Sequence, residues 1–119
     1  MSTPEVIVYE KSSCSTCRNL AKLLRDNDVE FEKVEYILDP LSADELRALL
    51  KKLRVPAREL VRTKEAEYAA AGLGPHSTDE QIIAAIAAQP RLMQRPVVVR
   101  GKRAVIARPA ERVLEILQD

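Results

Sequence analysis

The feature that most constrains this chain is a pair of cysteines placed between a short apolar run and a helical pattern. The segment is Ser13-Cys14-Ser15-Thr16-Cys17-Arg18-Asn19, and it follows the apolar residues 6–9. A strand that leads directly into a helix brings the unpaired N–H groups and the positive dipole end of that helix against the thiol. These groups stabilise a thiolate and would also hold an anion. Cys14 is therefore the first candidate for a catalytic residue.

The pattern around the cysteines predicts an α/β fold. Residues 6–9 are expected to form a buried strand, residues 15–27 a helix, and residues 31–36 a strand that alternates apolar and charged side chains. A strand, a helix and a strand within about thirty residues make a βαβ unit. The two strands should therefore be parallel.

A block of helices is expected at about residues 41–90. Ser42 and Glu45 make a capping-box pattern, and Pro56 ends the helix that follows it. The apolar stripe of that helix consists of Leu46, Leu49, Leu50 and Leu53. Ser77 and Glu80 predict a second capping box. The helix after it carries Ile82, Ile83 and Ile86.

The end of the chain has the pattern of a β-hairpin and a helix. Residues 96–99 and 103–107 are apolar runs joined by a turn that contains Gly101. Pro109 suits the first turn of a last helix. The inward-facing residues of that helix should be Val113, Leu114 and Leu117. The order βαβ, helical block, ββα predicts a thioredoxin-like single domain over residues 1–119, with a mixed sheet flanked by helices.

Composition is that of an ordinary globular domain. The chain has 119 residues, which is enough for a core without disulfide staples. A net charge of +1 gives no reason to expect direct binding to nucleic acid or a membrane. We see no leader segment and no membrane-spanning run. We therefore expect a cytoplasmic protein, in which a close cysteine pair is catalytic or redox-sensing.

Four segments of the chain match the pattern of a known family. They are residues 14–19, Glu59-Leu60-Val61-Arg62, Arg95-Pro96-Val97-Val98-Val99 and Arg108-Pro109. With these segments the chain resembles the glutaredoxin-linked arsenate reductases, the ArsC family of the ArsC/Spx superfamily, over residues 6–117. The resemblance implies an oxidoreductase of thioredoxin fold that reduces arsenate in arsenic resistance.

The resemblance also implies a role for each matching residue. Cys14 would be the nucleophile, and arginines would surround it and bind the oxyanion. These arginines are Arg62, Arg95 and Arg108. The Arg95–Pro96 bond would be the cis-proline that thioredoxin-like folds place beside their active cysteine. Glutathione would attack the Cys14–arsenate adduct as a cosubstrate, glutaredoxin would reduce the product, and no bound cofactor or metal is implied.

Elementary electrostatics agrees with these roles. Arsenate at neutral pH is a doubly charged oxyanion, and a guanidinium group pairs with such oxygens in bidentate fashion. Nearby arginines also lower the pKa of a thiol, so that a Cys14 thiolate can attack As(V) and displace an oxygen. The backbone N–H groups of residues 15–17, and Arg18, are further candidates for holding the oxygens.

Two positions depart from the pattern of the family. Its well-studied members often carry a His-Asn pair where this chain has Glu10-Lys11-Ser12. We expect Lys11 or the helix dipole to tune the thiol in place of that histidine, against the charge of Glu10. Those members also usually lack a cysteine that matches Cys17. This residue lies one helical turn from Cys14, so it is either a small packing residue or a resolving thiol that forms an intramolecular disulfide.

Other functions stay open at this point. The Spx-type transcriptional regulators resemble the reductases in fold, carry a Cys-x-x-Cys redox switch and bind RNA polymerase. A thiol-disulfide reductase that uses Cys14 and Cys17, with thioredoxin or glutaredoxin as partner, is a third interpretation. A zinc site is disfavoured because two cysteines and the distant His76 are too few ligands. The tyrosines are interpreted as packing residues: Tyr9, Tyr36 and Tyr68.

Overall fold

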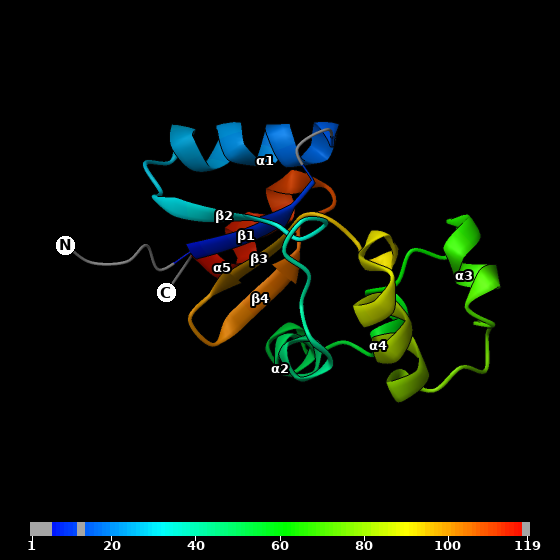
Figure 1. Ribbon diagram of the computed structural model, residues 1–119. Helices are drawn as coiled ribbons and strands as arrows, with labels where there is room; N and C mark the ends of the chain where they lie inside the picture. Colours follow the sequence, from blue (N-terminus) through cyan, green and yellow to red (C-terminus); the bar gives the residue numbers. More distant parts are fainter. Residues whose placement is uncertain (1–5, 12–13, 118–119) are drawn as a thin grey trace. The chain divides into compact units, whose positions relative to one another are not determined.

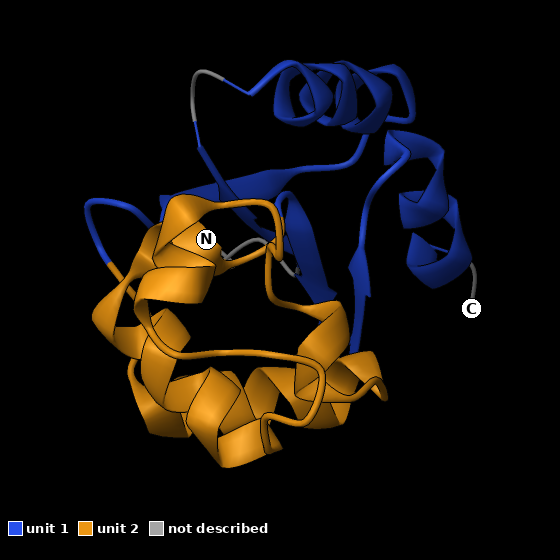
Figure 2. Cartoon of the chain, turned by 90° about the vertical axis from the view of Figure 1, so that its right-hand side faces the viewer, with its two compact units in different colours: residues 1–39, 95–119 blue, residues 40–94 orange. Residues whose placement is uncertain are grey.

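The computed structural model describes residues 6–11 and 14–117. The expectations that involve Ser12 and Ser13 lie outside these residues. The chain divides into two compact units, one made of residues 1–39 and 95–119 and the other of residues 40–94 (Figure 2). The cysteine loop belongs to the first unit and Arg62 to the second. The single domain expected over residues 1–119 stays a prediction.

The first unit is built on a four-stranded sheet with the strand order β2-β1-β3-β4 (Figure 1). β1 (Val6–Glu10) runs parallel to β2 (Phe31–Glu35) and antiparallel to β3 (Val97–Arg100). β3 pairs in turn with β4 (Arg103–Ile106) as an antiparallel hairpin. The predicted βαβ unit, hairpin and mixed sheet are thus confirmed.

α1 (Ser15–Asp26) lies along one face of this sheet (Figure 1). Leu20 and Leu24 of the helix pack with Val6 and Val8 of β1 in one core cluster. Successive side chains of a strand alternate between the two faces. Since Val6, Val8 and Glu10 are the buried positions of β1, Glu10 lies on the α1 side of the sheet.

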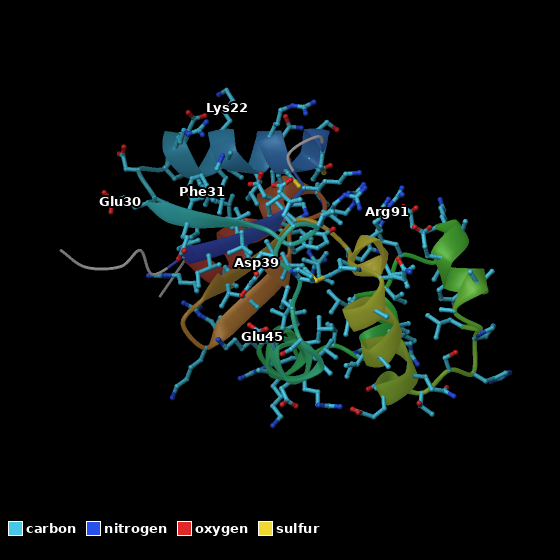
Figure 3. The ribbon with its side chains drawn as sticks, in the orientation of Figure 1. Lys22, Glu30, Phe31, Asp39, Glu45 and Arg91 are labelled. Carbon is cyan, nitrogen blue, oxygen red and sulfur yellow. The ribbon has the colours of Figure 1, made fainter. Side chains whose placement is uncertain are left out.

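The outer face of α1 is polar. The Lys22 side chain points away from the sheet, while Phe31 of β2 lies beneath the helix (Figure 3). Lys22 forms an exposed ion pair of 2.8 Å with Asp26 one turn on. Phe31 packs against the core cluster of the first unit. This separation of polar and apolar faces is what the helical period of the sequence predicts.

The last segment of the chain differs from the expected single helix. A 3-10 helix, η3 (Ala110–Val113), is followed by the short α5 (Leu114–Leu117). Val113 and Ile116 are buried, whereas Leu114 is 38% exposed. Residues three apart share a face in 3-10 geometry. The buried residue that follows Val113 is therefore Ile116 and not Leu114. The prediction that Leu114 faces inward is therefore wrong.

The second unit is helical among the residues that the structure describes. Its elements are α2 (Ala43–Leu53), η1 (Ala57–Glu59), α3 (Ala66–Ala70), α4 (Asp79–Ala88) and η2 (Pro90–Leu92). The capping box predicted at Ser42 and Glu45 is present, with both reciprocal hydrogen bonds. α2 ends ahead of Pro56, because Arg54 adopts the left-handed conformation at φ 58°. No helix in the described part of the chain is long and apolar enough to cross a membrane.

The second capping box lies one residue later than predicted. Thr78 caps α4 and exchanges hydrogen bonds with Gln81. The Ser77 hydroxyl instead accepts a hydrogen bond of 2.9 Å from the Gly74 N–H, and Glu80 forms an ion pair with α2. The pairs Ser77/Glu80 and Thr78/Gln81 both fit the capping-box pattern. The hydroxyl of Ser77 is bound to the Gly74 N–H, so Thr78 caps the helix and the prediction from Ser77 and Glu80 is wrong.

Truncation of Leu24 tests how strongly α1 is held to the sheet. Leu24 is 0% exposed, so Leu24→Ala leaves a cavity under the helix. We expect the free energy of unfolding, measured by urea denaturation, to fall by about 2–5 kcal/mol. Leu38 is 83% exposed, and Leu38→Ala is the matched control, with an expected change below about 0.5 kcal/mol. Equal effects of the two substitutions would contradict the packing described for α1.

Candidate active site

Cys14 caps the N-terminus of α1 with its own side chain. Its backbone is extended, at φ -86° and ψ 124°, and its Sγ accepts a hydrogen bond from the Cys17 N–H at 3.4 Å. This is the contact that a serine or aspartate makes as an N-cap, here made by sulfur. The Cys14 N–H donates to the Lys11 carbonyl at 3.0 Å, which links the start of α1 to the residue directly after β1.

The surroundings of Cys14 favour its thiolate. Burial by itself raises the pKa of this half-buried thiol. The hydrogen bonds from the Cys17 side chain and from the N–H groups of Cys17 and Thr16, together with the charge on Arg95, outweigh burial and lower the pKa below its ordinary value. Each of these groups stabilises the negative sulfur. Cys14 is therefore the more readily ionised thiol of the pair.

Cys17 has the opposite character. It is 1% exposed, and burial raises the pKa of its thiol to about 12, assisted by the hydrogen bond with Cys14 and by the charges of Cys14 and Glu10. A hydrogen bond from the Lys11 backbone N–H acts in the other direction. Both cysteines are free thiols. The site thus joins an ionisable, accessible sulfur to a buried, protonated one.

Arg95 is the arginine whose charge reaches Cys14. Burial lowers the pKa of its guanidinium, but hydrogen bonds with Tyr36 and Cys14 raise that pKa above its ordinary value. Its Nε is buried without a hydrogen-bond partner among the described residues, which leaves donor capacity for an anion. The Arg95–Pro96 bond, expected to be cis, is cis in the structure.

Tyr36 does more than the packing role that its sequence position suggested. Its side chain is 1% exposed, and its hydroxyl holds the guanidinium of Arg95. Arg95 follows Tyr36 by about half the length of the chain, so only the fold brings the two together. No signal in the sequence pattern points to this contact.

The other predicted arginines occupy different surroundings. Arg108 is exposed, and its Nη1 donates to the Arg95 carbonyl at 3.0 Å. Arg62 lies in the second unit, where its Nε pairs with Glu65 at 3.0 Å. Arg18 is exposed on the first turn of α1. The structure thus places Arg108 against the backbone of Arg95, and the convergence of all the arginines on one oxyanion stays a prediction.

Glu10 is a residue whose burial the sequence did not reveal. Among the described residues it is the one buried charged side chain, at 7% exposed, and its Oε1 has no hydrogen-bond partner there. Burial raises the pKa of its carboxyl, and the charge of Glu35 raises it further. The charges of Lys33 and Arg25 lower this pKa but do not outweigh burial. We expected its charge to act against the nucleophilic thiol. In the structure its charge raises the pKa of Cys17.

Comparison with known protein families finds one that spans most of the chain. The sequence model of the ArsC family matches residues 9–116. The chain belongs to the ArsC family. An arsenate reductase of Rhizobium meliloti (strain 1021) is 36% identical over 115 residues, which cover 96% of this chain and 82% of the relative. YfgD, an uncharacterized protein of Escherichia coli (strain K12), is 44% identical over 117 residues, 97% of this chain and 98% of that protein.

Solved structures of the ArsC family share this fold. An arsenate reductase from Vibrio cholerae superimposes with a TM-score of 0.90 at 32% sequence identity, covering 97% of this chain and 99% of that one. The predicted thioredoxin-like α/β fold is therefore confirmed. Within residues 6–11 and 14–117, no group of three or more His, Cys, Asp or Glu side chains is arranged to hold a metal ion.

Removal of the charge beside Cys14 is expected to raise the pKa of its thiol. Alkylation by iodoacetamide follows the thiolate fraction, so its rate profile for Arg95→Ala should move to higher pH. The rate at neutral pH should fall roughly tenfold. Peptide mapping assigns the label to Cys14. Arg103→Ala, at an exposed position of β4, is the control with an unchanged profile. A profile of Arg95→Ala that matches the control would contradict the role of Arg95.

The buried carboxyl of Glu10 also predicts a dependence of stability on pH. A pKa raised by folding contributes stability that is present below the unfolded pKa and is lost as pH rises through the folded pKa. Glu10→Gln should therefore be more stable than the wild type at neutral pH, by on the order of 1 kcal/mol. The difference should shrink below about pH 4. Urea denaturation at both pH values measures it, and a constant difference would exclude ionisation of Glu10 as the cause.

Proposed function

We propose that this ArsC-family protein is an arsenate reductase whose nucleophile is Cys14. The observation that carries the proposal is a thiol of lowered pKa at the N-cap of α1, with the guanidinium of Arg95 beside it. The thiolate is the attacking form, and guanidinium groups pair with oxyanions. The relatives named arsenate reductase support arsenate, or a related oxyanion, as the substrate and favour this function over a redox-sensing regulator.

In the first step the Cys14 thiolate attacks arsenic. An As–S bond forms, an As–O bond breaks, and the departing oxygen leaves as hydroxide that solvent protonates to water. Arg95 neutralises the oxyanion, and Arg108 and Arg18 are further ligands in this proposal. The N–H groups at the start of α1 supply fixed donors, which stabilise the charge that develops on the arsenate oxygens.

The second step supplies the two electrons that convert As(V) to As(III). A second thiol attacks the Cys14 sulfur, an S–S bond forms, and the electron pair of the As–S bond stays on arsenic, which leaves as arsenite. That thiol is either glutathione or Cys17. We favour Cys17, because its hydrogen bonds to Cys14 hold it in place and give it a high effective concentration.

An external dithiol protein then regenerates the enzyme. Reduction of the Cys14–Cys17 disulfide by glutaredoxin or thioredoxin would restore both thiols. Under this proposal glutathione is an alternative cosubstrate and no bound cofactor takes part. Two free thiols in one site require a reducing compartment, which supports a cytoplasmic location.

A single turnover without added thiol tests the proposal. The reduced protein, freed of other thiols, is mixed with arsenate, and the arsenite released is measured. We expect the wild type to release arsenite in proportion to the protein present, because Cys14 and Cys17 supply both electrons. Cys14→Ser should release none under any condition. Cys17→Ser should release none until glutathione is added.

The matched pair of serine substitutions separates the two roles. Arsenite from Cys14→Ser would refute Cys14 as the nucleophile. Arsenite from Cys17→Ser without added thiol would refute Cys17 as the source of the second sulfur. A wild type that forms no arsenite with glutathione and glutaredoxin, or with thioredoxin, would overturn the proposed function.

A further inference from the structure

We propose that Glu10 accepts the proton of Cys17 when that thiol attacks the covalent intermediate on Cys14. This inference rests on the proposed function where the intermediate on Cys14 is an arsenate adduct. A mixed disulfide on Cys14 undergoes the same attack, so the step can be tested without arsenate. The starting observation is the buried carboxyl of Glu10 at the end of β1, whose Oε1 has no hydrogen-bond partner among the described residues.

The strand and the helix bring Glu10 and Cys17 together. The last two buried residues of β1 are Val8 and Glu10. The first two buried residues of α1 are Cys17 and Leu20. The chain reverses between the two elements, so the end of β1 meets the first turn of α1 (Figure 1). Leu20 and Val8 belong to one core cluster, and the next inward positions of the two elements, toward the junction of β1 and α1, are Cys17 and Glu10.

A second contact places the Cys17 sulfur at the same point. The backbone N–H of Lys11, the residue directly after Glu10, forms a hydrogen bond with the Cys17 sulfur. The charge of Glu10 acts on this sulfur as well. Both side chains are buried on the facing sides of β1 and α1, and the Oε1 of Glu10 is an acceptor without a hydrogen bond in the described part of the chain.

The reaction creates the need for such an acceptor. In the resting protein the buried thiol of Cys17 shares a hydrogen bond with the Cys14 sulfur. Once Cys14 is bonded to arsenic or to another sulfur it carries no negative charge, and it no longer competes for the proton. Cys17 must still lose its proton to attack, because the thiolate is the nucleophile. At 1% exposed, Cys17 depends on a base within the protein.

The proposed step balances atoms and electrons. The proton of Cys17 goes to the Oε1 of Glu10, and the Cys17 sulfur forms a bond with the Cys14 sulfur. The bond from Cys14 to arsenic breaks with its electron pair on arsenic, so two thiols are oxidised as As(V) becomes As(III). When the external dithiol reduces the disulfide, Glu10 returns the proton to Cys17.

Charged groups on two elements surround Glu10. Lys33 and Glu35 of β2 share its face of the sheet, because the register pairs Lys33 with Val8 and Glu35 with Glu10. Arg25 of α1 also acts on it, and like Lys33 it favours the ionised carboxyl, whereas Glu35 opposes ionisation. Burial outweighs the two cations and raises the pKa of Glu10. A carboxyl of raised pKa is a stronger base and is better matched to a thiol.

An aromatic disulfide reagent separates the two thiols in time. Cys14 attacks the reagent and releases one coloured thiolate, and Cys17 then attacks the mixed disulfide and releases the second. Stopped-flow absorbance resolves the two phases on the full chain. In Glu10→Gln we expect an unchanged first phase and a second phase slowed by on the order of a hundredfold at neutral pH. The second phase should recover as pH rises and hydroxide replaces the carboxylate.

Three further variants assign the result. Cys17→Ser should show the first phase alone, which identifies the second. Glu10→Asp keeps a carboxylate and should restore part of the rate, with the midpoint of its pH profile shifted. Glu32→Gln removes an exposed carboxylate of β2 and should match the wild type in both phases.

The outcomes distinguish this inference from the proposed function. A second phase in Glu10→Gln with the rate and pH profile of the wild type would overturn the role of Glu10. Were Glu10→Gln unable to fold, a pH profile of Glu10→Asp identical to that of the wild type would overturn it equally. A second phase that depends on Glu10, in a protein that forms no arsenite from arsenate, would uphold the proton transfer and refute the substrate.

Discussion

The site depends on one hydrogen bond, from the Cys17 N–H to the Cys14 Sγ at 3.4 Å. The bond caps α1, and it also stabilises the thiolate that the proposed chemistry needs. The two effects are coupled, because a helix that frays loses its donor and a sulfur that turns away uncaps the helix. Packing of Leu20 and Leu24 on β1 keeps that first turn in place.

The different surroundings of Cys14 and Cys17 shift the pKa values of two chemically identical side chains in opposite directions. Cys14 lies where backbone N–H groups and Arg95 reach it, whereas Cys17 lies on the buried face of α1, where the charge of Glu10 acts on it. The first environment favours negative sulfur and the second opposes it. The same helical turn therefore holds one thiol of lowered pKa and one of raised pKa. The carboxyl that penalises the charged form of Cys17 is, in our proposal, the group that removes its proton.

Features written in short stretches of sequence could be predicted, and features that need distant contacts could not. The spacing of apolar residues predicted β1, α1 and the hairpin. The position of Cys14 directly before a predicted helix identified it as a candidate catalytic residue. Ser77 and Thr78 carry the same capping pattern, so only the turn at Gly74 decides between them. The contact of Tyr36 with Arg95 and the burial of Glu10 arise from tertiary packing, which no local pattern encodes.

The close placement of a thiol of raised pKa beside a thiol of lowered pKa has a consequence under oxidative stress. Peroxide attacks the more ionised sulfur, which converts Cys14 to a sulfenic acid. Left alone, such a group can be oxidised further to forms that ordinary reductants do not repair. Cys17, one turn away and shielded from the oxidant, condenses with it to a disulfide and expels water. With Cys17 as the resolving thiol of our proposal, the pair would give the protein a reversible oxidised form during an oxidant burst.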